Sequence, residues 1–434
     1  MKAWERIYRS KVTTAAEAIR SVANGDNLYL TSNCSVPQQL LGALVDRARA
    51  DDVRDVTIHQ LLTIGNTDYV APEMAGKIRA NALFIGPNIR KAVQQGRVDF
   101  TPVFLGETPK LFKEKIIPLD VALVHVSPPD EHGFCSFGVE VGLTKPAAES
   151  ARIIIAEVNE QMPRTLGNSF IHVSKLTHIV PVNYPLIELP QGTPGDLEKA
   201  IGSHIAEMIP DGATLQLGIG AIPDGVLYYL QDKRDLGIHS ELFSDGVVDL
   251  VEMGVVTNDR KTLHPGKIIA GMLLGTKRLY DFSDDNAMVE LHPQDYVNDP
   301  FVIAQNDNMI AINSAIEVDL TGQVCADSMG PRLYSGVGGQ VDFVRGAARS
   351  KGGKPIIALP ATARDGTVSR ITPMLRQGAG VVTTRNDVHY VVTEFGVADL
   401  YGKTIRHRVE ALIGISHPQF RSDLRKQARE LGYI

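Results

Sequence analysis

Short apolar runs rich in β-branched residues recur along the chain, and longer segments with a helical spacing of apolar positions separate them. The runs are VTIHQLL, ALFIG, VALVHVS and RIIIAEV, followed later by ATLQLGI, MIAINSAIEVD, PIIALPA and VHYVVTEFGVADL. Segments such as TPKLFKEKII and RHRVEALIGI have the helical spacing. Strands that alternate with helices are typical of βαβ units, so the pattern predicts an α/β fold with mainly parallel sheets.

An internal echo suggests that this pattern occurs twice. Residues 17–44 align without a gap with residues 203–230, and each copy reads as a helix, a turn, an apolar strand, a loop and a second helix. The second helix begins near a shared proline, a residue favoured at the first helical position. The identity is low and general α/β alternation explains part of it. The proline- and glycine-rich segment 188–196 marks the seam, so we predict related halves at 1–190 and 191–434.

The loops of the two copies differ in composition. Where the first copy has Ser32 and Cys34, the second has Gly218 and Gly220. Glycine lets backbone N–H groups approach a ligand, and a helix N-terminus attracts anions. The second copy is therefore the candidate anion site, although a tight strand-to-helix turn explains the glycines equally well.

A second glycine-rich loop lies at 335–353. Gly336, Gly338 and Gly339 precede Gln340 and Asp342, and a helical pattern follows. Backbone amides and the helix dipole can hold a phosphate there. The loop lacks the lysine of a P-loop and the spacing of a dinucleotide fingerprint, and a flexible surface loop is the alternative.

Composition narrows the setting. A chain of 434 residues is long enough for two or three domains, and 44% apolar with 22% charged residues is ordinary for a globular protein. The net charge of −6 argues against nucleic acid as a partner. Three scattered cysteines, no apolar leader region and no long apolar run predict a cytoplasmic protein without a membrane segment.

The segment HVSPPDEHGFCSFG could be mistaken for a metal site. It contains His125, Asp130, His132 and Cys135, but their spacing matches no zinc pattern and two prolines force a turn between them. We predict a structured loop at a strand end that lines the substrate cleft, and no metal.

The chain offers few conventional nucleophiles. It has no G-x-S-x-G elbow and no evident Ser-His-Asp order, which leaves carboxylates. Glu241 and Glu394 are the candidates, because each lies at the end of an apolar run or beside small residues. A lone glutamate is more often a solvated surface residue, so position alone does not select either.

Four motifs in order resemble the acetyl-CoA hydrolase/transferase family, and within it the 4-hydroxybutyrate CoA-transferase type. They are LGIGAIPDGV, IHSELFSDGVVDL, SGVGGQVDFVRGA and the C-terminal VVTEFGVADLYGKTIRHRVEALIGISHPQFRSDL. The resemblance covers essentially the whole chain. It implies two tandem halves with the CoA-transferase (NagB/RpiA-like) fold, in agreement with the internal echo.

The same resemblance implies roles for particular residues. Glu241 falls at the position of the catalytic glutamate, and Glu394 belongs to a motif whose role is structural. The residues expected to bind CoA are Gly218, Ile219, Gly220, Ala221, Ile222, Ile316, Gly338, Gly339 and Lys354. Whether His239 and Ser240 orient Glu241 or only shape its strand end stays open.

The implied chemistry is CoA transfer between a short-chain acyl-CoA and a carboxylic acid, without a permanently bound cofactor. A carboxylate with a reference pKa of about 4.3 is ionised near pH 7 and attacks a thioester without a general base. The acid pair expected is 4-hydroxybutyrate or butyrate with acetyl-CoA or acetate. An acyl-CoA hydrolase and a noncatalytic effector-binding protein are the alternatives, and a homodimer is the expected assembly.

Overall fold

The structure is a computed structural model that describes residues 2–434, and its contacts divide the chain into two compact units. Unit 1 comprises Met1–Pro190 and Ile269–Val297, and unit 2 comprises Gln191–Ile268 and Asn298–Ile434. The predicted seam at residue 190 coincides with the first division. The segment Ile269–Val297, however, packs with unit 1 and not with the predicted C-terminal domain.

The segment Ile269–Val297, called the return segment below, joins unit 1 through backbone hydrogen bonds. Its strand β16 (Val289–Leu291) pairs in parallel with β8 (Leu166–Gly167). The Gly271 carbonyl also accepts hydrogen bonds from the N–H groups of Val141 and Gly142, at 3.1 and 2.9 Å. The internal echo ends at residue 230, so it could not predict that the segment Ile269–Val297 packs with unit 1.

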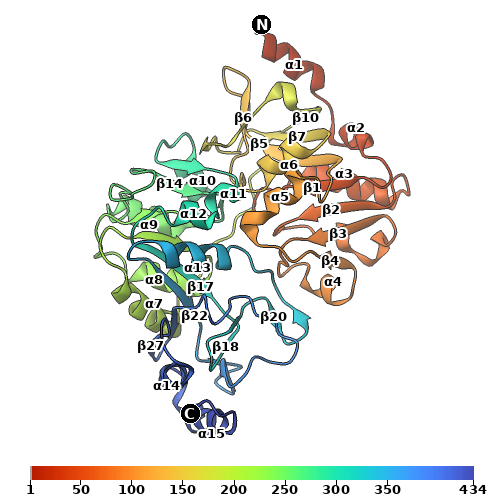
Figure 1. Ribbon diagram of the computed structural model, residues 1–434. Coiled ribbons are helices and arrows are strands. Elements are labelled where there is room, and N and C mark those ends of the chain that lie inside the picture. The colour runs from red at the N-terminus through yellow and green to blue at the C-terminus, as the bar shows by residue number, and fades with distance from the viewer. Residues whose placement is uncertain (1) are drawn as a thin grey trace. The chain divides into compact units, whose positions relative to one another are not determined.

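Unit 1 is built on a seven-stranded sheet that is parallel throughout, with the strand order β10-β7-β5-β1-β2-β3-β4 (Figure 1). The strands are β1 (Asn27–Leu30), β2 (Val56–Gln60), β3 (Ile78–Ala82), β4 (Val98–Phe100), β5 (Val121–Val126), β7 (Ile153–Asn159) and β10 (His178–Val182). β6 (Phe134–Ser136) and β9 (Phe170–His172) form an antiparallel pair, and the return segment adds β14 (Ile268–Ala270) and β15 (Met272–Leu273).

The helices of unit 1 are mostly short. They are α1 (Ala3–Lys11), α2 (Ala15–Ala18), η1 (Ile19–Ser21), α3 (Gln38–Arg49), η2 (Asp68–Val70), η3 (Pro72–Met74), α4 (Arg90–Gln94), η4 (Leu105–Glu107), α5 (Thr108–Lys113), α6 (Thr144–Ser150), η5 (Val173–Lys175), α10 (Lys277–Ser283) and α11 (Gln294–Val297). The α3 residues Leu40 and Leu44 are fully buried in one core cluster with Leu28 and Ile58 of the sheet. Side chains buried on both faces explain why these strands read as continuous apolar runs.

One predicted strand is misplaced. The sequence pattern assigned ALFIG to a strand, but the strand is β3 (Ile78–Ala82), which shares only Ala82 with that run. Small side chains such as Ala80 and Ala82 suffice between two neighbouring strands, whereas Leu83 and Ile85 bury themselves in the loop that follows. Apolar content alone does not distinguish a strand from a buried loop of this kind.

Unit 2 contains a six-stranded sheet in the order β12-β11-β17-β22-β26-β27, in which only β27 runs antiparallel. Its strands are β11 (Thr214–Leu217), β12 (Gly237–Ile238), β17 (Met309–Ser314), β22 (Lys354–Ala358), β26 (Tyr390–Thr393) and β27 (Gly396–Asp399). Shorter strands are β13 (Leu242–Phe243), β18 (Glu317–Asp319), β19 (Val324–Cys325), β20 (Ser328–Met329), β21 (Arg332–Leu333), β23 (Thr362–Ala363), β24 (Val368–Ser369) and β25 (Ile371–Thr372).

Helices cover this sheet and complete the predicted repeat. They are α7 (Asp196–Met208), α8 (Ala221–Tyr228), α9 (Asp245–Glu252), α12 (Pro300–Ile303), α13 (Gln340–Arg349), α14 (Ile405–Gly414) and α15 (Pro418–Glu430). The order α7-β11-α8 matches the helix, strand and helix that lead through β1 to α3 in unit 1. The prediction of an α/β fold with two related halves and mainly parallel sheets is confirmed. Between residues 2 and 434, no helix combines the length and the apolar character that a bilayer crossing requires.

Candidate active site

The carboxyl edge of the parallel sheet in unit 2 carries most of the predicted site residues. From β11 the strand order proceeds to β12 on one side and to β17 on the other, so the direction of the order reverses between β11 and β17. Ligands of open α/β sheets bind at the carboxyl ends of the strands beside such a switch point. The Gly218–Ile222 loop follows β11, Ile316 follows β17, and Glu241 follows β12.

Glu241 is positioned by the end of β12. The N–H of His239 donates to the carbonyl of Leu215 at 3.0 Å, which continues the parallel pairing one residue beyond the strand. The Ser240 hydroxyl donates to the carbonyl of Leu217 at 3.1 Å. Ser240 therefore shapes the strand end, which is one of the two roles that the sequence left open.

His239 is fully buried, and its ring packs edge-on against Phe343 of α13 with ring centroids 6.2 Å apart. This contact joins the strand that leads to Glu241 with the helix that follows the second glycine-rich loop. His239 thus contributes to the packing beneath the site.

The carboxyl group of Glu241 lies against the N-terminus of α13. It accepts hydrogen bonds from the backbone N–H of Gly339 and from the side chain of Asn298. A methyl group placed on Gly339 would come within 2.1 Å of Glu241 Oε2 and 2.3 Å of Asn298 Nδ2. Asn298 Nδ2 also donates to Asp342 Oδ2 at 3.2 Å. One amide thus holds two carboxylates, and a side chain at position 339 would displace the Glu241 carboxyl group and the Asn298 amide from these positions.

This environment changes the acidity of the carboxyl group. The pKa of Glu241 is raised from 4.5 to about 7, chiefly by burial and also by the nearby carboxylate of Asp342, while the hydrogen bonds from Asn298 and Gly339 act in the opposite direction. A carboxyl group with its pKa raised in this way is not fully ionised at neutral pH. The expectation of an ordinary, fully ionised glutamate at neutral pH is therefore revised for the protein without substrate.

The two glycine-rich loops each begin a helix. Gly220 precedes α8 with φ = 115°, and Gly338 has φ = 56° immediately before the cap of α13. These are backbone conformations that side chains rarely adopt. The first loop is open to solvent, with Ile219 38% exposed. The glycines of the segment 335–353 lead directly into α13, whose first residues Gln340–Val344 are buried, so this part of the segment is a packed helix and not a surface loop.

The end of β17, two residues before Ile316, is joined to the second loop by a hydrogen bond. The side chain of Gln340, the first residue of α13, donates to the Ser314 carbonyl at the end of β17, at 3.1 Å. Ile316 lies two residues further along the chain and is half-buried. The structure therefore brings Glu241, Gly338, Gly339, Ile316 and the Gly218–Ile222 loop to one edge of one sheet.

Lys354 does not belong to this group. It begins β22 opposite Ile310, whereas the carboxyl end of β22, at Ala358, lies opposite Ser314. Four strand residues place Lys354 about 13 Å from the site edge. Its ammonium group donates to the Met208 carbonyl at the end of α7, at 2.6 Å. The resemblance selected Lys354 by motif position, and the strand register places it at the opposite edge.

Glu394 lies in the hairpin between β26 and β27 and accepts a hydrogen bond from the N–H of Ala361 at 2.8 Å. This contact stabilises the chain beside β22 and agrees with the structural role that the resemblance implied. Three strands separate β26 from β12 in the sheet order, so the two candidate glutamates do not share a site.

The segment 125–138, HVSPPDEHGFCSFG, belongs to unit 1, and its polar side chains make separate contacts. His125 is fully buried beside Asn159, whose amide nitrogen lies 3.1 Å from His125 Nε2. Asp130 accepts the N–H groups of His132 and Phe134 and pairs with Arg164 at 3.1 Å. These contacts describe a structured turn, and within residues 2–434 no three metal-ligating side chains converge.

The helix of unit 1 that corresponds to α8 in the internal repeat is α3. Its N-terminus is occupied by a side chain of the protein itself. Glu157 of β7 is fully buried and accepts a hydrogen bond from the N–H of Leu40, in the first turn of α3, at 2.7 Å. It also accepts one from the Tyr184 hydroxyl. This side chain takes the position that an anionic ligand would need at the start of α3.

Three polar residues of the site were missed or left without a role by sequence reasoning. Asn298 stands in no short motif, and only its contacts with Glu241 and Asp342 reveal it. Asp342 was visible in SGVGGQVDF but had no evident partner. A third is Gln191, whose side-chain nitrogen donates to Asp224 of α8 at 2.7 Å and to Ser244, just beyond Glu241, at 2.8 Å.

Comparison with known proteins agrees with this geometry. The acetyl-CoA hydrolase/transferase N-terminal domain matches residues 1–188, and the acetyl-CoA hydrolase/transferase C-terminal domain matches residues 275–428. The chain belongs to this family.

The chain is 55% identical to the 4-hydroxybutyrate coenzyme A transferase of Clostridium kluyveri over 427 residues, which are 98% of this chain and 99% of that protein. It is 46% identical to the succinyl-CoA:cyclohexane-1-carboxylate CoA transferase of Geobacter metallireducens, covering 100% of this chain and 98% of that one. The crystal structure of 4-hydroxybutyrate CoA-transferase from Porphyromonas gingivalis superimposes with a TM-score of 0.86 at 42% identity, covering 99% of this chain and 100% of that one.

Hydrolases are more distant. The acetyl-CoA hydrolase of Neurospora crassa is 26% identical and aligns with 76% of this chain. The predictions of the family, of an enzyme and of a CoA-transferase are therefore confirmed.

Proposed function

We propose that Glu241 is the nucleophile of this CoA-transferase and that CoA is carried on it as a glutamyl thioester. The observation that supports this most directly is the position of its carboxyl group. It lies at the carboxyl edge of the sheet, against the Gly339 N–H and beside Asn298, with glycine-initiated helices at the ends of two loops.

The proposed reaction passes through an anhydride and a thioester of Glu241. The ionised Glu241 attacks the thioester carbonyl of the acyl-CoA, and CoA thiolate leaves, which produces an acyl-glutamyl anhydride. The thiolate then attacks the glutamyl carbonyl and the first carboxylic acid leaves as its anion, so that a glutamyl-CoA thioester remains. A second carboxylate reverses the sequence and regenerates Glu241.

Each attack passes through a tetrahedral oxyanion. Backbone N–H groups at the start of α8 and α13 are the donors available for it, because they are fixed by the fold before substrate binds. Removing one such donor typically costs about 3 kcal/mol of transition-state stabilisation. The raised pKa of Glu241 keeps a fraction of the side chain neutral but makes its carboxylate more basic, which favours attack on carbon.

The acid pair that we propose is 4-hydroxybutyrate or butyrate with acetyl-CoA or acetate, following the named activities of the similar proteins. Acyl selectivity depends on pocket shape, and one methylene changes discrimination by only about 1–3 kcal/mol. A panel of acids against acetyl-CoA would measure this preference. The thioester mechanism also predicts ping-pong kinetics, because the first acid leaves before the second binds. Double-reciprocal plots should give parallel lines, whereas intersecting lines would indicate a ternary complex and contradict the thioester.

We further propose a homodimer that works in the cytoplasm. The three cysteines are buried thiols, in keeping with a reducing compartment, and a two-fold dimer is the commonest assembly among soluble homo-oligomers. Light scattering of the purified protein tests the assembly, and a monomeric mass with full activity would refute it.

The central experiment traps the intermediate. The protein is incubated with butyryl-CoA without an acceptor acid, and peptide mapping should locate CoA within IHSELFSDG. The variant Glu241→Gln should lose the adduct, since an amide of nearly equal volume is a poor nucleophile. Glu241→Asp retracts the carboxylate by one methylene from the attack distance of roughly 3–3.5 Å, so its exchange rate should fall steeply.

The matched control is Glu394→Gln, which keeps an acceptor for the Ala361 N–H and should form the adduct normally. The Glu241→Gln protein must be used fresh, because deamidation would restore the acid. An adduct mapped to Glu394, or full turnover of verified Glu241→Gln, would overturn the assignment. The rate at which the trapped thioester loses CoA to water measures the residual hydrolase activity.

A further inference from the structure

Asp342 is a buried carboxylate, and its place in its own helix does not account for the burial. It is the third residue of α13 and is 7% exposed. An acidic side chain in the first turn of a helix is favoured by the helix dipole, and it has this effect at the surface as well. Burial of a charge is costly unless other groups compensate for it. The burial of Asp342 therefore calls for a partner outside α13.

That partner is the side-chain amide of Asn298. Asn298 is fully buried, and its amide donates to Asp342 Oδ2 at 3.2 Å and to the carboxyl group of Glu241. An amide nitrogen carries two N–H bonds, so both of them serve carboxylates. The amide oxygen Oδ1, by contrast, has no hydrogen-bond partner within residues 2–434. Turning the amide over would place this oxygen against two negative groups, so the two carboxylates together fix its orientation.

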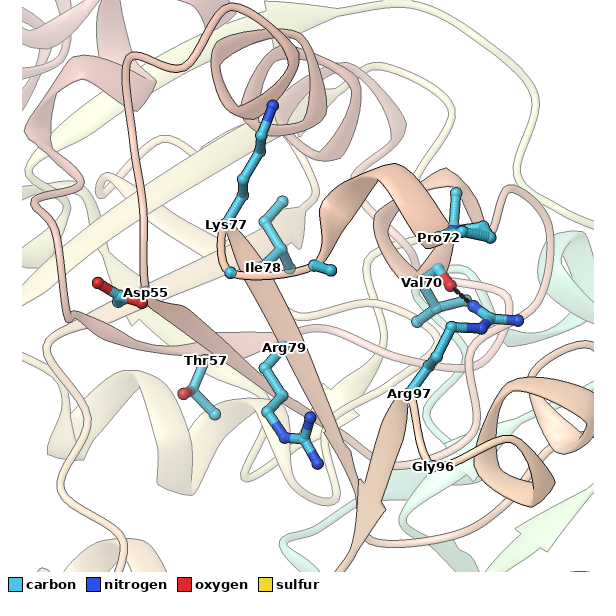
Figure 2. Close-up of a pocket in the computed structure, with 12 residues that line it drawn as sticks. Asp55, Thr57, Val70, Pro72, Lys77, Ile78, Arg79, Gly96 and Arg97 are labelled. Atoms are coloured by element: carbon cyan, nitrogen blue, oxygen red, sulfur yellow. Dashed lines mark hydrogen bonds between the residues drawn. The ribbon is translucent and has the colours of Figure 1, made fainter.

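Charged side chains do not converge in this way everywhere in the protein. A cavity of about 520 Å³ in unit 1 is lined by Arg79 and Arg97 among other residues (Figure 2). The guanidinium groups of these two arginines point away from each other in Figure 2, and Arg79 forms a two-pronged ion pair with Asp99. The cavity therefore does not bring two like charges to one group, as Asn298 does in unit 2.

The two carboxylates that share the Asn298 amide are like charges in a buried site. The negative charge of Asp342 raises the pKa of Glu241, in addition to the larger effect of burial. Other ionisable groups on the elements around Glu241 are His239 just beyond β12, Asp245 in α9 and Asp224 in α8. The charge that acts on the acidity of Glu241 comes from Asp342.

This repulsion lasts only as long as Glu241 is charged. In the first half of the proposed reaction, the Glu241 carboxylate and an acyl-CoA become a neutral glutamyl-CoA thioester and a free carboxylate. One negative charge thus leaves Glu241 with the departing acid, while Asp342 keeps its own charge. Formation of the thioester relieves the repulsion, and return to the free enzyme restores it.

We propose that Asp342 is a positioning residue that holds the Asn298 amide toward Glu241 and, by its charge, shifts the equilibrium from the free enzyme to the glutamyl-CoA thioester. The inference rests on the proposed role of Glu241 as the nucleophile. Asp342 acts through Asn298 and through its electric field, not through the substrate. A role limited to starting α13 would affect the stability of the fold but neither the acidity of Glu241 nor this equilibrium.

The test compares Asp342→Asn with the wild type. Asparagine has nearly the same volume and keeps an oxygen that accepts from Asn298, so the change removes mainly the charge. The midpoint of the pH profile of kcat/KM should fall by about one pH unit. Intact mass at pH 8 and a fixed ratio of butyryl-CoA to butyrate should show the ratio of CoA-bearing to free enzyme lowered about tenfold, since one pKa unit corresponds to that factor.

Asp342→Ala is the second variant, and it replaces Asp342→Asn if that protein does not fold. It removes the acceptor as well as the charge, so it should show the same shift of the midpoint and slower formation of the thioester, because the Asn298 amide is no longer held. The matched control is Asp232→Asn, the same change at an exposed position of unit 2, which should keep the wild-type midpoint and ratio.

The outcomes separate this inference from the proposed function. An adduct that maps outside Glu241 in the wild type would overturn both. If the adduct maps to Glu241 but Asp342→Asn keeps the wild-type midpoint and ratio, only the role of Asp342 fails. A loss of stability to urea in Asp342→Asn without either shift would assign Asp342 to helix formation alone and would likewise overturn the inference.

Discussion

The substitution Gly339→Ala tests the geometry of the candidate site without altering its charged groups. Gly339 has φ = −93° and ψ = 8°, a conformation open to alanine, so the backbone does not oppose the change. The added methyl carbon would lie 2.1 Å from Glu241 Oε2, and real contacts of this kind are not shorter than 3.0 Å. The carboxylate must therefore move by about 0.9 Å, and a misplacement of about 1 Å can reduce a rate by about 10²-fold.

Stability should change little in this variant. The obstructed atoms are the ends of two side chains, which can move, and alanine in place of glycine at a helix cap costs no more than about 1 kcal/mol. We expect glutamyl-CoA formation, followed by rapid quench and intact mass, to slow by about two orders of magnitude. The melting temperature should remain within a few degrees of the wild type.

Gly414→Ala is the control for Gly339→Ala, because nothing lies within 4 Å of the added carbon at the end of α14. It should react at the wild-type rate. If Gly339→Ala formed the thioester as fast as the control, the carboxyl group could not have been seated against Gly339 during attack, and the argument from this contact would fail.

Two further predictions concern pH. Because the pKa of Glu241 is about 7, kcat/KM for the acyl-CoA should rise roughly tenfold from pH 6 to pH 8 as the carboxylate forms, and a flat profile would contradict the raised pKa. Burial raises the pKa of Glu157 from 4.5 to about 7, so the folded state binds this proton more tightly than the unfolded state does. That contribution to stability is complete below pH 4.5 and is lost as the pH rises through 7, by about 3 kcal/mol in total. Urea unfolding at pH 5 and pH 8 should show Glu157→Gln gaining stability relative to the wild type at the higher pH, and an unchanged difference would refute this.

Local pattern determined the architecture of the protein. Strands of parallel sheets are buried on both faces, so runs such as VALVHVS and RIIIAEV announced β5 and β7 directly. The glycine-rich loops were also visible in the local sequence, since the positive φ before α8 and α13 favours glycine. Glu241 was identified by its motif, because the residue, its strand end and its helix are consecutive in the chain.

Tertiary structure decided what depends on register and on contacts between distant segments. Lys354 and Ile316 both belong to chain segments that the resemblance associated with CoA, but pairing of β17 with β22 places them at opposite edges of the sheet. The pKa of Glu241 depends on burial and on Asp342 and Asn298, which lie far from it in the sequence and approach it only in the folded structure. A one-dimensional pattern records which side chains are available, but their mutual distances follow from strand order and register, which the whole fold sets.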